Sequence, residues 1–289
     1  MSLQEHFEAG IDAIKKGQWH VAQKQFLILT HSFAQDDLPE NVDYYLALSY
    51  YQLEDYDFAN RYFSSYLQGV DHRQYFEEAL NYKFMIAVKF SQGAKKHFLG
   101  LESMPKWFSS REDAISLYGE IIAVLPYHEI AAKAFLGKAE ILKDLGRFKE
   151  SHETYQMFLQ RFPNHELAPQ AYLSLATLYL RQCKSQERNP DLIELARINL
   201  RKFKKKFPSY VNFAEVEEKL MEMAEIYAKE LCAIGQLYER KKKPKASIIY
   251  YSNTILEYPN TVAASFAKQR LRALKSWVLQ MNFARDILE

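Results

Sequence analysis

One spacing recurs along the chain and constrains its fold more than any single motif. A small residue is followed four positions later by a tyrosine or leucine, and eight positions after that by a proline. The four complete copies are Ala114/Tyr118/Pro126, Ser151/Tyr155/Pro163, Ala196/Leu200/Pro208 and Ser247/Tyr251/Pro259. Two earlier copies, Ala22/Phe26 and Ala59/Phe63, keep the first two positions and lack the proline. The recurrence predicts a repeat architecture of six similar units.

The spacing fits a helical hairpin. A small residue lets two helices cross closely, an aromatic residue one turn later fills the gap between hairpins, and proline ends the second helix. Glycine precedes the small residue in GQWHVA (17–22) and GRFKES (146–151), where it can adopt the left-handed conformation that ends a helix. Only nine Gly and nine Pro occur, and no strand-like alternation persists. We therefore expect an all-α fold.

These units resemble the tetratricopeptide repeat, whose consensus has small residues at positions eight and twenty, an aromatic at twenty-four and proline at thirty-two. If Ala59 is position twenty, Leu46, Ala47 and Tyr50 occupy positions seven, eight and eleven, where the family has Leu, Gly or Ala, and Tyr. The resemblance implies a right-handed solenoid of about six tetratricopeptide-like hairpins plus a C-terminal capping helix, within residues 261–289.

The proline spacing predicts where the units depart from this pattern. The prolines that end successive repeats, from Pro126 onward, are 37, 45 and 51 residues apart, so we expect insertions between paired helices at 98–113 and 184–191. Residues 213–243 instead show uninterrupted helical periodicity and predict one long helix that projects beyond its neighbours. We expect one continuous solenoid, with repeats 1–3 in residues 1–126 and repeats 4–6 in residues 127–289.

Motifs of enzyme chemistry are absent from the sequence. It contains no GxGxxG, GxxxxGK[ST], GxSxG or HExxH, and its eight histidines form no i, i+4 pair. Cys183 and Cys232 lack CxxC spacing and are expected to be separate buried thiols. We expect a non-enzyme with no catalytic residue, no cofactor and no metal site. No run of 18 apolar residues is present, so no membrane span is expected.

Three surfaces are candidates for binding a partner. The first is a predicted peptide groove in the second unit, flanked by acidic residues, with Asn41, Tyr44, Leu48, Tyr51 and Gln52 at the positions that line the concave face in tetratricopeptide domains. An extended peptide or strand with apolar side chains could bind there. Alternatively, Tyr44 and Tyr51 pack on the neighbouring hairpin.

The second surface lies in the insertion, where Met104, Trp107 and Phe108 form an apolar cluster with Pro105. These residues either contact a partner or fold back as a lid on the solenoid, and we favour the fold-back.

The third surface is a basic segment formed by Arg240, Lys241, Lys242, Lys243 and Lys245. It follows another basic stretch, RKFKKKF at 201–207, and residues 201–245 hold 12 basic and 7 acidic side chains. A solvated helix face explains RKFKKKF simply. An acidic protein or phospholipid headgroups are the alternatives, whereas nucleic acid is disfavoured because no recognition helix or stacking platform accompanies the charge.

The last third of the chain carries a more specific series of features. It comprises Phe207-Pro208, the predicted helix 213–243 with Tyr238 and Arg240 at its end, a small and apolar helix from 246 to 251, and Tyr258-Pro259-Asn260-Thr261. Arg-Asn-Pro-Asp at 188–191 precedes a helix with Ala196. This series resembles the outer-membrane assembly lipoprotein family (BamD, also YfiO).

The resemblance implies a scaffold on the periplasmic face of the outer membrane. Its C-terminal repeats would bind the periplasmic domains of the barrel-inserting protein, and its N-terminal repeats would meet β-barrel precursors. The chain would be a monomer within a hetero-complex, attached to the membrane only through a lipid anchor and bound to no nucleic acid. Because MSLQEHF carries no basic-then-apolar segment, we expect the signal and the anchor cysteine to be missing from this chain. The alternatives are a cytoplasmic tetratricopeptide adaptor or chaperone and a periplasmic envelope-coordination repeat protein.

Overall fold

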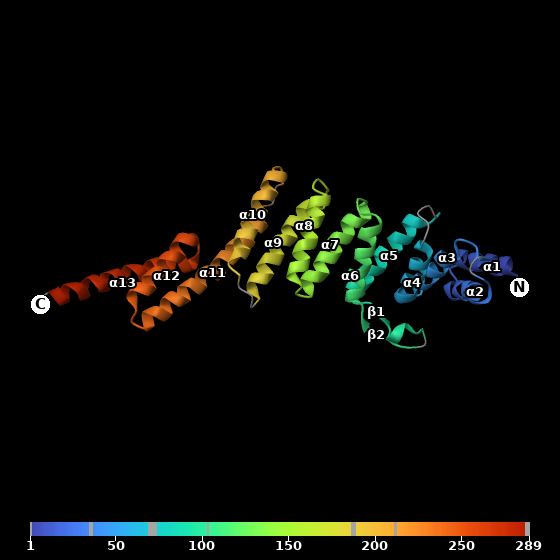
Figure 1. The fold of residues 1–289 in the computed structure, drawn as a ribbon, viewed down its shortest axis with the longest axis horizontal. Helices are drawn as coiled ribbons and strands as arrows, with labels where there is room; N and C mark the ends of the chain where they lie inside the picture. Colours follow the sequence, from blue (N-terminus) through green and yellow to red (C-terminus); the bar gives the residue numbers. More distant parts are fainter. Residues whose placement is uncertain are drawn as a thin grey trace. The chain divides into compact units, whose positions relative to one another are not determined.

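A computed structural model describes residues 2–34, 37–68, 74–102, 104–185, 189–210 and 213–286, with the backbone alone for Leu99 and for 276–286. These residues form thirteen α-helices and one two-stranded ribbon (Figure 1). The all-α prediction is therefore confirmed, with the ribbon as an addition. Arg188, which begins the Arg-Asn-Pro-Asp likeness, lies outside the described residues, as do residues 186 and 187 of the second predicted insertion, Ser103 of the first and residues 287–289 of the predicted cap.

The chain divides into two compact units, Met1–Phe162 and Pro163–Glu289, which we call unit 1 and unit 2 and describe separately. This division falls later than the expected one between residues 126 and 127. The continuity of the solenoid stays a prediction.

Unit 1 contains eight helices and the ribbon. In chain order its elements are α1 (Leu3–Lys15), α2 (Trp19–Ser32), α3 (Val42–Gln52), α4 (Tyr56–Leu67), α5 (Phe76–Ser91), β1 (Lys95–His97), the 3₁₀ helix η2 (Phe98–Gly100), β2 (Lys106–Ser109), α6 (Arg111–Val124), α7 (Glu129–Asp144) and α8 (Phe148–Arg161). Unit 2 contains α9 (Ala168–Lys184), α10 (Asp191–Lys206), α11 (Ala214–Arg240), α12 (Pro244–Glu257) and α13 (Val262–Asp286).

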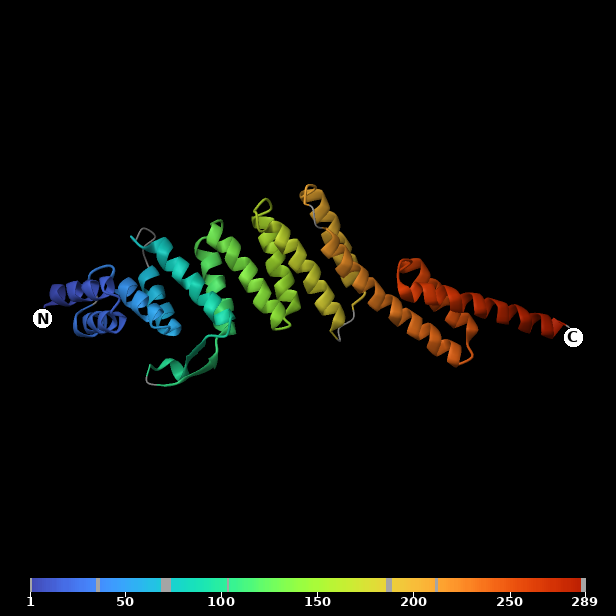
Figure 2. The same cartoon turned by 180° about the vertical axis from the view of Figure 1, so that it is seen from behind.

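Consecutive helices pair as hairpins in both units. In unit 1 α1 packs on α2, α3 on α4, α5 on α6 and α7 on α8, and in unit 2 α9 packs on α10 and α11 on α12. Helix α13 then covers α12 and part of α11 (Figure 2). The prediction of about six hairpins and a capping helix is confirmed. The ribbon lies between the two helices of the third hairpin, so an insertion separates these paired helices. It spans 92–110 rather than the predicted 98–113, because β1 begins at Lys95 and α6 already begins at Arg111.

The small residues of the repeat lie where the paired helices cross. All six are buried, and the two serines also bond the facing helix. Ser151 Oγ donates to the carbonyl of Ala139 at 2.8 Å, and Ser247 Oγ donates to the carbonyl of Gly235 at 2.8 Å. A Cβ at Gly235 would lie 2.8 Å from the ring of Tyr251, so only glycine permits this crossing.

The aromatic position is buried in five of the six units, and Leu200 is the exception. Leu200 is only half-buried, and the fully buried ring in its hairpin is Phe203, which stacks on Tyr172 at 5.0 Å between ring centroids. The bulkier Phe203 occupies the core one helical turn later.

The first helix of five of the six pairs ends with one backbone geometry. The second residue after the helix has positive φ, at Gly17, Glu54, Gly93, Gly146 and Lys242. In each turn its N–H bonds the carbonyl three residues back, and the next N–H bonds the carbonyl five residues before itself. This is the Schellman motif, which suits glycine because a Cβ is strained at positive φ. Glu54 and Lys242 adopt it at a conformational cost.

Helix α11 confirms the long helix predicted for residues 213–243, with a shorter extent. Its 27 residues span about 40 Å, and it ends at Arg240 because Lys242 turns the chain and Pro244 begins α12. Helix α11 packs on α9 and α10 and also on α12 and α13. Its projection beyond these neighbours stays a prediction.

Candidate protein-binding surfaces

The predicted basic segment forms the turn between α11 and α12, and we call it the basic turn. Arg240, Lys241, Lys242, Lys243 and Lys245 are all exposed. None of the five forms an ion pair with another residue that the structure describes. The turn backbone is fixed by the N–H of Lys243, which bonds the carbonyl of Tyr238 at 2.9 Å. Five positive charges are thus held on a short, ordered loop.

A half-buried contact beside the basic turn fixes its position on unit 2. Glu239, the residue before the turn, accepts hydrogen bonds from Tyr251 of α12 at 2.9 Å and from Arg270 of α13. Burial alone would raise the pKa of Glu239, but the hydrogen bonds from Arg270 and Tyr251 outweigh it and lower the pKa. Three helices therefore meet at one carboxylate that stays ionised.

The other basic stretch, 201–207, differs from the basic turn. Its cations Arg201, Lys202, Lys204, Lys205 and Lys206 are exposed at the end of α10. Lys204 pairs with Glu217 of α11 at 2.5 Å and lies 5.7 Å from the ring centre of Phe213. Part of this charge is therefore neutralised within unit 2.

The predicted peptide groove runs along α3, and the structure places its two tyrosines against α5. The ring of Tyr44 is buried and stacks on Tyr75 at 4.4 Å, and its hydroxyl donates to Glu78 at 2.8 Å. Burial, together with this bond, raises the pKa of Tyr44. The hydroxyl of Tyr51 lies 3.7 Å from the sulfur of Met85. These contacts are those of the alternative in which the tyrosines pack on the neighbouring hairpin.

The other three predicted groove residues are Asn41, which precedes α3, and Leu48 and Gln52, which lie on α3. Asn41 accepts a hydrogen bond from Tyr66 and donates one to Gln74, at 3.2 and 3.3 Å. Leu48 is half-buried and Gln52 is exposed. Peptide binding by the predicted peptide groove stays a prediction.

The base of the insertion, formed by His97 and Lys106, contacts the turn between α3 and α4 and the first turn of α4. The backbone N–H of His97 donates to Asp57 at 3.0 Å, and the His97 Nδ1 lies 2.9 Å from the same carboxylate. Lys106 Nζ lies 2.6 Å from Asp55 and donates to the carbonyl of Glu54 at 2.9 Å. The base of the insertion therefore folds back on unit 1.

The apolar residues of the insertion remain accessible in spite of this anchor. Met104 and Phe108 are exposed, and Trp107 is 71% exposed. Phe108 stacks on Phe98 at 5.5 Å, which holds it within the ribbon. The fold-back thus covers the base of the insertion and leaves the predicted contact cluster facing solvent.

Sequence reasoning missed an apolar hollow in unit 2. Its cavity is about 330 Å³, and it lies between α10, α11 and the turn that precedes α13. Leu200, Leu220, Met221 and Tyr258 contribute apolar lining. The available signal was Leu200 itself, because the other units carry an aromatic ring at this position, and the smaller side chain leaves space.

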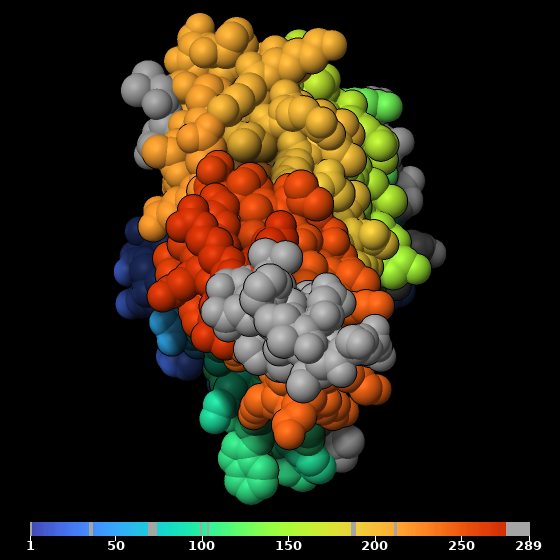
Figure 3. Space-filling model, turned by 90° about the vertical axis from the view of Figure 1, so that its left-hand side faces the viewer, coloured from blue at the N-terminus to red at the C-terminus, as the bar shows by residue number. Residues whose placement is uncertain are grey.

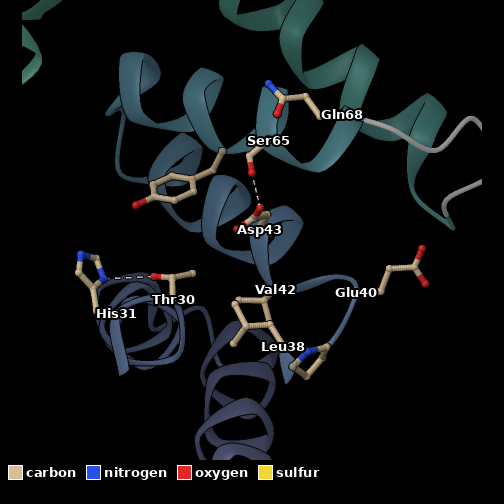
Figure 4. Close-up of a pocket in the computed structure, with 10 residues that line it drawn as sticks. Thr30, His31, Leu38, Glu40, Val42, Asp43, Ser65 and Gln68 are labelled. Atoms are coloured by element: carbon tan, nitrogen blue, oxygen red, sulfur yellow. Dashed lines mark hydrogen bonds between the residues drawn. The ribbon is translucent and has the colours of Figure 1, made fainter. Parts of the chain in front are cut away.

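A second hollow lies in unit 1, between the end of α2, the start of α3 and α4 (Figure 4). Its cavity is about 650 Å³ and its lining is largely polar. Asp43 accepts a hydrogen bond from Ser65 at 2.5 Å, and Thr30 lies 3.2 Å from the ring nitrogen of His31 (Figure 4). These polar groups are engaged with one another, so the hollow carries no reactive arrangement.

The described residues contain no cluster of three or more His, Cys, Asp or Glu side chains that could hold a metal ion. Cys183 and Cys232 are both buried as thiols rather than joined as a disulfide. Within the same part of the chain, none of the helices is both long and apolar enough to cross a membrane. The features that remain are surfaces.

Stacked pairs of helices that expose charged and aromatic surfaces define a helical-repeat module for protein interaction. Residues 144–282 match the YfiO family model, described as an outer membrane lipoprotein, over slightly less than half of the 289-residue chain. The match covers α8 and nearly all of unit 2, including the basic turn. No curated protein is significantly similar to this chain.

Several solved structures are also similar to the chain. A TPR repeats protein from Bacteroides fragilis NCTC 9343 is 12% identical, covers 96% of this chain and 99% of its own length, and has a TM-score of 0.45. A tetratricopeptide repeat protein from Parabacteroides merdae ATCC 43184 is 12% identical, with coverages of 94% and 98% and a TM-score of 0.41. MamA from AMB-1 is 14% identical, with coverages of 73% and 94% and a TM-score of 0.39. These low scores carry no argument about function.

Proposed function

We propose that the protein is a non-catalytic scaffold of the machinery that assembles β-barrel proteins into the outer membrane. Unit 2 would bind the periplasmic domains of the barrel-inserting protein, and unit 1 would receive barrel precursors. The observation that carries the proposal is the match of residues 144–282 to a family of outer membrane lipoproteins. The protein would then work at the periplasmic face of the outer membrane.

The basic turn is the edge of unit 2 best suited to an acidic protein domain. Its five cations are exposed and lack ion pairs among the described residues, whereas Lys204 on α10 is already paired with Glu217. The contact of Glu239 with Arg270 and Tyr251 holds the turn in place, so little order would have to be gained on binding. In Figure 3 the surface of unit 2 around α12 and α13 faces the viewer, in orange to red.

Site-specific photocrosslinking in intact cells tests the proposal. A photoreactive amino acid replaces Lys242 in the basic turn, and a control places it at Lys205, which is equally exposed on α10. We expect a crosslink to the barrel-inserting protein from position 242 and a much weaker one from position 205. Crosslinks confined to soluble cytoplasmic proteins would refute the proposal and favour the cytoplasmic adaptor.

A further inference from the structure

The ribbon of unit 1 contains an irregularity that exposes one residue. In its antiparallel register Lys96 pairs with Phe108 and His97 pairs with Lys106, so Trp107 is an extra residue without a partner on β1. Such a β-bulge turns a side chain away from the regular pleat. Trp107 is accordingly 71% exposed. The ribbon projects from the helices of unit 1 in two opposite views (Figures 1 and 2).

We propose that this ribbon, formed by β1 (Lys95–His97) and β2 (Lys106–Ser109), binds an extended peptide strand, which adds to the open edge of β2 and packs on Trp107. The sheet has the order β1-β2, and β2 pairs with no further strand among the residues that the structure describes. One edge of β2 therefore presents backbone groups to solvent. An added strand would satisfy these groups, as in other peptide complexes that extend a sheet.

The anchor at the base makes this edge ordered before any peptide arrives. An isolated two-stranded ribbon is at best marginally stable in water. Here His97 is buried against Asp57, and its ring lies 5.3 Å from that of Phe58 in an edge-on arrangement. Lys106 on β2 is fixed to Asp55. A preformed edge costs less entropy on binding than a loop that must first fold.

The exposed side chains indicate what the bound strand carries. Leu101, Met104, Trp107 and Phe108 form an apolar patch on the ribbon. Proteins usually protect an open strand edge with charge, proline or a bulge, and β2 has Lys106 and the bulge at Trp107. The apolar side chains that stay exposed beside this edge are nevertheless typical of a binding site. Because alternate residues of a strand point to the same side, the patch fits a strand with apolar side chains at alternate positions.

The charge at the base of the ribbon adds a further requirement. Of the four cations in residues 95–111, Lys96 pairs with Asp113 at 2.7 Å and Lys106 pairs with Asp55 at 2.6 Å. Lys95 and Arg111 are exposed and form no ion pair within the described residues. A strand with an acidic residue near one end therefore complements the site. Strands of barrel proteins alternate in this way, so this source of the peptide rests on the proposed function, whereas the binding mode does not.

The test uses purified protein and a fluorescein-labelled ten-residue peptide in which Tyr, Leu and Phe alternate with Thr and Ser before a terminal Asp. Fluorescence anisotropy measures its affinity, which we expect to be on the order of 10 µM. A second peptide keeps every side chain but carries N-methyl groups on alternate backbone amides. A third peptide has the same composition with its apolar residues clustered. The protein variants are Trp107→Ala and the control Tyr127→Ala, since Tyr127 is an equally exposed aromatic of unit 1, outside the ribbon.

We expect N-methylation and Trp107→Ala each to weaken binding by about tenfold or more, and Tyr127→Ala to leave it unchanged. The clustered peptide should also bind more weakly. Equal affinity for the methylated peptide, or for the Trp107→Ala protein, would overturn the inference. It would also be overturned if analytical ultracentrifugation showed a dimer that depends on Trp107 and that the peptide does not dissociate, because a second copy of the chain would then occupy the edge. Crosslinking at position 242 is independent of these outcomes, so this inference and the proposed function can fail separately.

Discussion

A glycine-to-alanine pair tests the close helix crossing on which the repeat is built. Gly235 lies in α11, and a Cβ there would approach the ring of Tyr251 to 2.8 Å. That ring is fully buried and bonded to Glu239, so it has little room to move. Gly119 lies in α6, where the nearest neighbour of a Cβ is the flexible end of Lys138 at 3.7 Å.

The two substitutions should change the free energy of unfolding in opposite directions. Alanine is favoured over glycine within a helix by about 1 kcal/mol, so Gly119→Ala should stabilise the protein by up to that amount. The same gain applies to Gly235→Ala, but overpacking of a dense core costs about 1–3 kcal/mol. We expect Gly235→Ala to destabilise the protein by roughly 1 kcal/mol relative to the wild type and by roughly 2 kcal/mol relative to Gly119→Ala.

Urea unfolding followed by circular dichroism measures this difference. Because the two units can unfold separately, a fluorescent label in each unit should be followed together with the circular dichroism signal. Gly235→Ala should cost less in a Tyr251→Leu background than in the wild type, because leucine leaves room for the new methyl group, and a double-mutant cycle measures this difference. If Gly235→Ala were as stable as Gly119→Ala, the close crossing of α11 and α12 would be refuted.

Three further predictions concern single contacts. Lys242 has φ of 54°, and Lys242→Gly should raise the free energy of unfolding by about 1 kcal/mol, measured by urea unfolding, whereas Lys243→Gly should not. The lowered pKa of Glu239 means that its bond with Arg270 stabilises the fold above the unfolded carboxyl pKa of about 4.3, and that this stabilisation is lost as the pH falls through the lower folded value. The melting-temperature difference between wild type and Arg270→Gln should therefore be constant from pH 6 to 8 and shrink below about pH 4. Lys83 is buried and bonds Glu120 at 2.8 Å, and Lys83→Met should change stability by less than about 1 kcal/mol because the burial of its charge offsets the bond.

The sequence predicted the hairpins because their packing depends on local spacing. The small residue indicates where two helices cross, the aromatic residue fills the gap beside that crossing, and the proline ends the second helix. Their fixed spacing therefore predicts the six hairpins. Two turns were harder to predict, because Glu54 and Lys242 adopt a conformation that glycine usually marks. The hollow beside Leu200 could have been predicted from the missing ring.

The ribbon could not be predicted from local pattern. Its strands are three and four residues long, too short for an alternating pattern to be recognised. Its position depends on the contact of His97 with Asp57, 40 residues earlier in the chain. Contacts of this kind are set by the folded hairpins, so the exposure of Trp107 became visible only in three dimensions.

We proposed that unit 2 binds the barrel-inserting protein, and that the basic turn is the edge that binds it. Titration calorimetry of the purified protein with the periplasmic domains of that partner measures it directly, with the triple charge reversal of 241–243 to Glu compared with the matched reversal of Lys202, Lys205 and Lys206 on α10. Each reversal of an exposed lysine that faces an acidic surface of the partner costs about 1 kcal/mol of binding free energy at low salt. The turn variant should therefore lose about 3 kcal/mol, or about 100-fold in affinity.

This loss should shrink strongly at 1 M salt, where charges are screened beyond about 3 Å. The α10 variant should bind almost as the wild type does, and neither variant should change the melting temperature appreciably, because exposed charges contribute little to stability. The account predicts a salt-sensitive loss confined to the basic turn. No measurable binding by the wild type, or an equal loss in both variants, would contradict it.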